Sequence, residues 1–215
     1  MSKKKLKRFT EFKTFSNSFD FPFEMKGKWK SDFFKNQNPL VLELGCGKGE
    51  YSVALATQYP NKNFIGIDLK SNRMWKGASI ALEKKLTNVA FIRAIINKIT
   101  ELFNKDEVDE IWITFPDPFP KDKHEKHRLT SPKFLERYKE ILNKDGFVNF
   151  KTDDDDLFNY TLEILNEQKI IPIEINLDVH ANDDSHPHLR EIKTHYEKLF
   201  MGRGRTIKYL KFKFT

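Results

Sequence analysis

Apolar runs and amphipathic stretches alternate along most of the chain. Short apolar runs predict buried strands at 40–44, 63–68, 89–93, 108–114, 146–151 and 169–177. Between them, helical spacing of apolar residues predicts helices at 48–58, 71–84, 131–143, 154–167 and 190–200. Polar residues at 178–190 predict a loop, and Ile207, Leu210, Phe212 and Phe214 predict a terminal strand. Strands alternating with helices are typical of an α/β protein with a doubly wound, mostly parallel sheet.

The chain of 215 residues is most simply one folded domain preceded by a segment of different composition. A chain of this length buries roughly 70% of its unfolded surface without disulfides or metals. We therefore assign residues 39–215 to a single domain and residues 1–38 to an N-terminal extension.

The stretch Val41–Glu50 joins a buried strand to closely spaced glycines. Glycines let the backbone turn sharply and approach a ligand. A dinucleotide-binding G-x-G-x-x-G would need a glycine at position 50, where the chain has Glu50. The chain instead has an acid, Glu43, followed by G-x-G-x-G, which resembles motif I of class I methyltransferases. The resemblance implies that Glu43, Gly45 and Gly47 contact S-adenosylmethionine, and the alternative is a glycine-rich turn without a ligand.

A second acid, Asp68, ends the next apolar run, 23 residues after Gly45. A carboxylate at the carboxyl end of the second strand can accept hydrogen bonds from both ribose hydroxyls of an adenosine. Asp68 is therefore a second candidate for cofactor binding. Its alternative role is the N-cap of the helix expected from Ser71, and the two roles are compatible.

The segment Phe115–Leu129 follows the strand at 108–114, where ligands bind in open α/β sheets. Three prolines within five residues restrict its backbone and hold Asp117 in place. Methyltransferases that modify exocyclic amines carry an acid or Asn, two adjacent prolines and an aromatic residue here, and this chain lacks the adjacent prolines. Methylation of cytosine carbon 5 would require a nucleophilic Cys, which is absent. We therefore expect a different acceptor.

Three motifs make the chain similar to the bacterial tRNA (guanine-N(7)-)-methyltransferase family over residues 38–207. They are F-P-D-P-F-P-K at 115–121 with the basic run after it, F-K-T-D at 150–153, and T-H-Y-E at 194–197. The resemblance implies a Rossmann-like sheet of about seven strands with the last one antiparallel. It also implies cofactor contacts from Glu43, Asp68 and Asp117. The substrate contacts that it implies are those of Lys121, Asp153, Thr194, His195, Tyr196 and Glu197.

Two residues depart from the family's pattern. Phe119 stands where the family usually has Trp, which preserves the apolar character of the position. Ile95 stands where many members have an acid or Asn near the adenine amine of the cofactor. That contact must then come from the backbone or be missing.

The reaction that the resemblance implies is compatible with these residues. Guanine nitrogen 7 has a lone pair in the plane of the ring, so no proton has to leave before it attacks the sulfonium methyl group. Positioning is then the main catalytic task. The purine gains positive charge, and we expect the Asp117 carboxylate to stabilise that charge and orient the base, with Asp153 as a second candidate. The acids at 154–156 have a simpler explanation, because acidic residues stabilise the first turn of a helix.

Positive charge is concentrated at the start of the chain. Residues 1–38 hold ten Lys or Arg, four acids and nine aromatic residues, and carry six of the seven surplus positive charges. Cations mixed with aromatic residues are typical of surfaces that bind phosphates and stack on bases, so we expect this extension to bind RNA. We expect Lys123, His124, Lys126 and Arg128 to contact RNA at the mouth of the site. A merely solvated surface is the alternative for residues 1–8 and for this basic loop.

The remaining composition excludes several classes of protein. Cys46 is the only cysteine, so neither a disulfide framework nor a Cys-based metal site is expected. No apolar run reaches the length of a membrane helix and no signal peptide follows the basic start, so we expect a soluble cytoplasmic protein. We predict an enzyme that methylates nitrogen 7 of a guanine in the variable loop of tRNA, without a metal. The alternatives are a class I methyltransferase with another RNA or a small molecule as substrate, and an inactive RNA-binding protein of the same fold.

Overall fold

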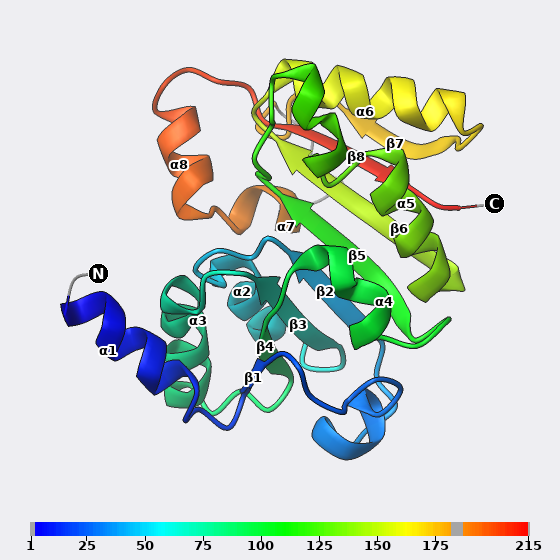
Figure 1. Cartoon of the computed structure of the whole chain (residues 1–215). Coiled ribbons are helices and arrows are strands. Elements are labelled where there is room, and N and C mark those ends of the chain that lie inside the picture. Colours follow the sequence, from blue (N-terminus) through cyan, green and yellow to red (C-terminus); the bar gives the residue numbers. More distant parts are fainter. Residues whose placement is uncertain (1–2, 182–186, 215) are drawn as a thin grey trace.

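The computed structural model describes residues 3–181 and 187–214, which form one eight-stranded sheet with helices on both faces (Figure 1). The strands are β1 (Ser18–Asp20), β2 (Leu40–Leu44), β3 (Asn63–Asp68), β4 (Val89–Arg93), β5 (Val108–Thr114), β6 (Leu142–Thr152), β7 (Pro172–Asn176) and β8 (Lys208–Phe212). The α-helices are α1 (Lys3–Phe12), α2 (Glu50–Gln58), α3 (Ser71–Glu83), α4 (Ile99–Leu102), α5 (Pro132–Ile141), α6 (Asp155–Glu167), α7 (Pro187–Glu191) and α8 (His195–Met201). Short turns of other helix types cover Trp29–Phe33, Ile96–Lys98 and Asp122–His127.

The strands lie in the order β1-β4-β3-β2-β5-β6-β8-β7. In the described part of the chain neighbouring strands are parallel, except that β8 runs antiparallel to β6 and β7. The predicted doubly wound, mostly parallel sheet with an antiparallel last strand is confirmed. The strand beyond the expected seven is β1, which pairs with β4 at the edge of the sheet.

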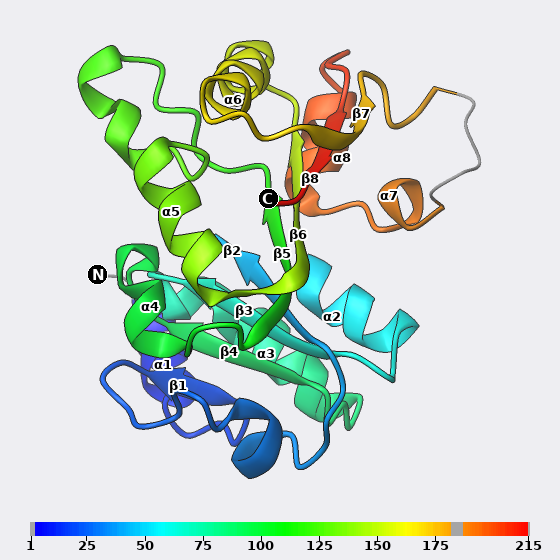
Figure 2. The same ribbon diagram turned by 90° about the vertical axis from the view of Figure 1, so that its right-hand side faces the viewer.

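Helices α4, α5 and α6 cover one face of the sheet, and α2, α3, α7 and α8 cover the other (Figure 2). β2 is buried along its whole length because it lies in the middle of the sheet, between β3 and β5. Alternate β2 residues therefore enter the two cores: Leu42 packs on the side of α5 and α6, and Val41 packs on the side of α2 and α3.

Most predicted elements are present with shifted ends. The helix predicted at 190–200 is two helices, because Thr194 takes an extended conformation and its hydroxyl accepts the Glu197 amide to cap α8. Asp154 caps α6 in the same way, through the Leu157 amide, which confirms the structural explanation for this acid. Of the loop predicted at 178–190, residues 182–186 lie outside the described residues and α7 begins at Pro187.

The aromatic residues of the N-terminal segment pack against the domain. Phe12 and Trp29 are fully buried, Phe34 is 7% exposed, and Phe19 contacts the rings of Trp29 and Phe33. The Trp29 indole also donates a hydrogen bond to the Leu102 carbonyl, 3.1 Å away. The prediction that the segment's aromatic residues stack on RNA is therefore wrong for Phe12, Trp29 and Phe34. These side chains cover apolar surface of the sheet and its helices that would otherwise face water.

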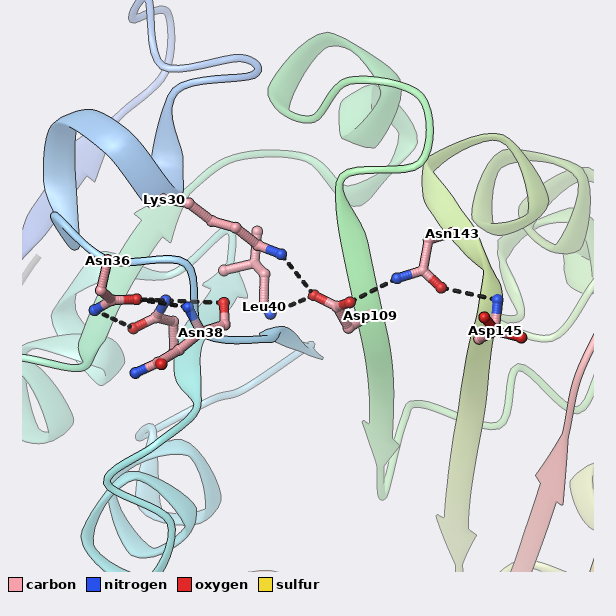
Figure 3. A network of polar contacts seen from close by, with 8 residues as sticks. Lys30, Asn36, Asn38, Leu40, Asp109, Asn143 and Asp145 are labelled. Carbon is pink, nitrogen blue, oxygen red and sulfur yellow. Dashed lines mark hydrogen bonds and ion pairs between the residues drawn. The ribbon is translucent and has the colours of Figure 1, made fainter.

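A polar network at the amino ends of the strands fixes the same segment (Figure 3). One oxygen of Asp109 accepts the Leu40 amide at 2.6 Å and the Lys30 ammonium at 3.0 Å, and the other accepts the Asn143 amide at 2.6 Å. Asn36 and Asn63 exchange side-chain hydrogen bonds beside it. The carboxylate thus joins the N-terminal segment to β2, β5 and β6.

Asp109→Asn should destabilise the fold, because all three partners of the carboxylate are donors and an amide would oppose one of them with a further donor. We expect urea unfolding to show a loss of about 1–3 kcal/mol. Asp145→Ala is the matched control: its side chain is 76% exposed and forms a surface ion pair with Lys213, so a change below about 0.5 kcal/mol is expected. Equal stabilities of the two variants would contradict this role of Asp109.

Candidate active site

A cleft of about 590 Å³ opens at the carboxyl ends of the central strands. It lies between the neighbouring strands β2 and β5, after which the chain continues to helices on opposite faces of the sheet. Open α/β sheets bind ligands at this position. Ten of the predicted site residues line it: Glu43, Gly45, Gly47, Asp68, Ile95, Asp117, Asp153, Thr194, His195 and Tyr196. The cleft therefore brings together residues from most of the length of the chain.

The glycines after β2 have distinct roles. Gly45 and Gly47 have φ angles of +74° and +54°, and a Cβ at either position would meet no atom closer than 3.8 Å. The loop therefore faces the open cleft at Gly45 and Gly47. Replacing either glycine by another residue would be disfavoured by the positive φ angle rather than by a steric clash. At Gly49 a Cβ would lie 2.4 Å from the Phe91 ring, so this glycine serves the packing of the loop on β4.

Glu43 forms the floor of the cleft and is 4% exposed. Its carboxylate accepts hydrogen bonds from the Ser52 amide at 2.9 Å, the Ser52 hydroxyl, and the Thr114 hydroxyl at 3.0 Å. Burial raises the pKa of Glu43 to about 7, although these hydrogen bonds favour the charged form. The side chain can therefore change its charge near neutral pH.

Asp68 holds two loops at the rim of the cleft. Its carboxylate accepts the Gly47 amide at 3.0 Å and the Lys70 amide at 2.8 Å. It does not cap α3, because the N-cap residue of that helix is Lys70, which makes no side-chain cap bond. The alternative N-cap role of Asp68 is therefore wrong, and its carboxylate instead fixes the glycine loop beside it.

Asp117 stands on a constrained loop and is exposed to the cleft. The loop begins at Phe115, whose amide bonds to the Lys151 carbonyl at 2.8 Å, and it passes Phe115 and Phe119 with φ angles of +50° and +45°. Non-glycine residues rarely adopt positive φ, and such strain is concentrated at functional sites. Ile95 is 51% exposed at the same cleft, as an apolar wall.

Asp153 forms an ion pair within the cleft with Arg205, a residue outside the predicted site. The Arg205 guanidinium lies 2.6 Å from an Asp153 oxygen, and the Asp153 side chain is 7% exposed. Arg205, Phe200 and His127 also line the cleft. Their place in the cleft could not be predicted from sequence spacing. Phe200 and Arg205 lie beyond the last motif, at 194–197, and His127 is one of several basic residues in its loop.

The motif at 194–197 is divided between the cleft and the interior. Thr194, His195 and Tyr196 line the cleft, and the His195 amide donates to Glu50 at 2.8 Å. Glu197 is fully buried and does not line the cleft, so its predicted contact with the substrate stays a prediction. Its carboxylate lies 2.8 Å from the Lys151 ammonium, which is also fully buried, and ties α8 to β6.

The basic segment after Asp117 forms a short helical turn beside the cleft. Lys121, Lys123 and Lys126 are exposed, and His124 is half-buried, so their predicted contacts with substrate and RNA stay predictions. Arg128 differs from them. Its guanidinium is half-buried and donates hydrogen bonds to the Pro118 and Phe119 carbonyls, and its predicted contact with RNA also stays a prediction.

This arrangement fits S-adenosylmethionine chemically. A cationic amino-acid end suits the buried acid and open glycine loop, ribose hydroxyls suit a carboxylate like that of Asp68, and apolar walls such as Ile95 suit an adenine ring. Among the described residues, no group of three or more His, Cys, Asp or Glu side chains is arranged to hold a metal ion. Nor does any helix in the described part of the chain have the length and apolar character needed to cross a membrane.

Solved structures with the same fold are methyltransferases. The 16S rRNA methyltransferase KamB superposes with a TM-score of 0.65 at 15% identity, over 88% of this chain and 92% of that one. A SAM-dependent methyltransferase from Aquifex aeolicus superposes with a TM-score of 0.56 at 18% identity, over 82% of both chains. The fold of this chain is therefore that of class I methyltransferases.

Sequence comparisons show the particular family. Residues 37–210 match a family model described as a putative methyltransferase. The tRNA (guanine-N(7)-)-methyltransferase of Christiangramia forsetii is 48% identical, over 99% of this chain and 98% of that protein. The protein of the same name from Cytophaga hutchinsonii is 43% identical, over 100% of this chain and 99% of that protein. This chain belongs to the tRNA (guanine-N(7)-)-methyltransferase family, as its motifs indicated.

The raised pKa of Glu43 predicts a specific pH dependence of stability. Its carboxyl group binds a proton more tightly in the folded state, with a pKa of about 7, than in the unfolded chain, with a pKa near 4.5. Stability should therefore fall as pH rises from about 4.5 to about 7, by on the order of 3 kcal/mol from this group. Glu43→Gln keeps an acceptor for Ser52 and removes the titration.

Urea unfolding of both proteins at pH 5 and pH 8 would test this prediction. Relative to the natural protein, Glu43→Gln should be more stable at pH 8 than at pH 5, by an amount of that order. The same difference between the proteins at both pH values would show that Glu43 does not titrate in this range.

Proposed function

We propose that this protein transfers the methyl group of S-adenosylmethionine to nitrogen 7 of a guanine in the variable loop of tRNA, in the cytoplasm. The observation that carries the proposal is that the Asp117 carboxylate and the acid-and-glycine loop after β2 open onto one cleft. The relatives' names supply the acceptor, and their similarity extends over the whole chain. The loop of the tRNA is the inference from resemblance.

We assign cofactor binding to the part of the cleft around β2 and β3. When bound, S-adenosylmethionine supplies an electrophilic methyl group. Glu43, Gly45 and Gly47 would hold its amino-acid end, Asp68 its ribose, and Ile95 its adenine. The Asp68 carboxylate accepts hydrogen bonds from the Gly47 and Lys70 amides, and these bonds hold it in one orientation.

The guanine would enter beside Asp117, with Asp153, Thr194, His195 and Tyr196 as further contacts. Nitrogen 7 carries its own lone pair, so this chain has no proton to remove and acts by orientation and charge. Asp117 would stabilise the positive charge that develops on the purine, which makes it the catalytic residue. The exposed Tyr196 ring and the Arg205–Asp153 pair provide stacking and hydrogen-bonding groups for a base.

Incubation with labelled S-adenosylmethionine and unmodified tRNA, followed by nucleoside analysis and mapping of the modified position, tests this function. We expect 7-methylguanosine in the variable loop. Asp117→Asn keeps the shape and removes the charge, so turnover should fall by at least about tenfold with little change in tRNA affinity. Labelling of another base, or lost tRNA binding with normal turnover of the bound fraction, would overturn the respective assignment.

The lysines of α1 are proposed to bind tRNA phosphates. The helix packs on α3, with Arg8 over the Trp75 ring at 4.7 Å, and leaves Lys3, Lys4 and Lys7 exposed. Their combined replacement by Gln should reduce the slope of log affinity against log salt by about 2 to 3 units, while turnover at saturating tRNA hardly changes.

Fluorescence titration at several salt concentrations measures the slope. The matched control replaces Lys28, Lys105 and Lys144, which are exposed near the amino ends of the strands, by Gln. Equal slopes for the α1 variant and the natural protein would mean that these lysines are merely solvated.

A further inference from the structure

Arg128 lies against the loop that carries Asp117 and does not line the cleft itself. Its Nε atom lies 3.3 Å from both the Pro118 and the Phe119 carbonyl oxygens, and its Nη2 atom lies 3.1 Å from that of Phe119. Asp117, Pro118 and Phe119 all line the cleft. The guanidinium therefore contacts the backbone immediately after Asp117.

The guanidinium is itself held from the other side. It lies over the Tyr160 ring, 4.2 Å from its centre, and the Tyr160 hydroxyl donates to Glu125 at 2.8 Å. The Arg128 amide bonds to the Glu125 carbonyl at 2.8 Å. Because Tyr160 belongs to α6, which packs on the sheet, these contacts link the Asp117 loop to a rigid part of the fold.

The loop has a conformation that calls for such support. Phe119 has a φ angle of +45°, a conformation that a non-glycine residue keeps only when surrounding contacts support it. Arginine has a planar fork of donors that can bridge two adjacent carbonyls, whereas lysine has a single ammonium that acts as a point charge. The arrangement therefore depends on the shape of the side chain as well as on its charge.

We propose that Arg128 is a positioning residue for the methyl transfer, because it fixes the Pro118 and Phe119 carbonyls and thereby the place of the Asp117 carboxylate in the cleft. This role rests on the proposed function of Asp117. It separates Arg128 from its basic neighbours: Lys123 and Lys126 face outward, while Arg128 acts on the substrate only through the loop.

Steady-state kinetics with Arg128→Ala and Arg128→Lys test the proposal. A small misplacement of a catalytic group is costly, so we expect kcat to fall about tenfold or more in both variants, with KM for either substrate changed by less than about threefold. Added methylguanidinium should restore part of the kcat of Arg128→Ala, but not that of Asp117→Asn. Arg137→Ala is the control, because Arg137 also lies over an aromatic ring but donates its hydrogen bond to Asn97, which is not part of the Asp117 loop.

Three results would overturn the proposal. An unchanged kcat in Arg128→Ala would show that the loop holds its place unaided. Weaker tRNA binding, with a salt slope reduced by about 1 unit and a normal kcat at saturation, would make Arg128 a phosphate contact. A fall in kcat that follows a lowered melting temperature, without rescue by methylguanidinium, would make its role purely structural. Absence of 7-methylguanosine with the natural protein would instead refute the proposed function.

Discussion

The buried carboxylate of Glu43 is the contact on which the cleft depends. The side chain projects from the end of β2. Its carboxylate accepts hydrogen bonds from Ser52 in the first turn of α2 and from Thr114 at the end of β5. The strand that leads into the glycine loop and the strand that leads into the Asp117 loop are therefore joined below the cleft. Burial makes the charge costly, and a cationic ligand above it would lower that cost. One residue thus connects the fold to the chemistry of the site.

The opposite end of the sheet is joined by a similar device. Asp109 accepts three hydrogen bonds from Lys30, Leu40 and Asn143, so a single carboxylate gathers the N-terminal segment and three strands. Buried or half-buried acids surrounded by donors are well satisfied, whereas neutral side chains would leave donors unpaired. One carboxylate therefore joins neighbouring strands at each end of the sheet, and the loops that follow the strands are available for function.

The sequence predicted the central part of this architecture because its signals are local. Leu40–Leu44 is apolar throughout, and Glu43, Gly45 and Asp68 follow strands at the spacing of a βαβ unit, so their convergence on one cleft could be inferred. β1 was not predicted, because it is only three residues long and is stabilised by its pairing with β4 at the edge of the sheet. The burial of Phe12 and Trp29 was not predicted either. A segment that mixes aromatic residues with lysines has the same composition whether its aromatic side chains bind RNA or pack inside the fold.

Cations show the limit of sequence reasoning most clearly, because identical residue types have different partners in the fold. Lys151 is buried against Glu197, Arg205 pairs with Asp153, and Arg128 bonds to backbone carbonyls. Each of these cations holds part of the cleft wall and has its charge or donors already engaged. For exposed lysines such as Lys121 and Lys123 phosphate contacts stay a prediction, and a charge count alone could not distinguish their positions from those of the bonded cations. The positive charge of this chain is therefore divided between cations that are bonded within the fold and lysines that face solvent.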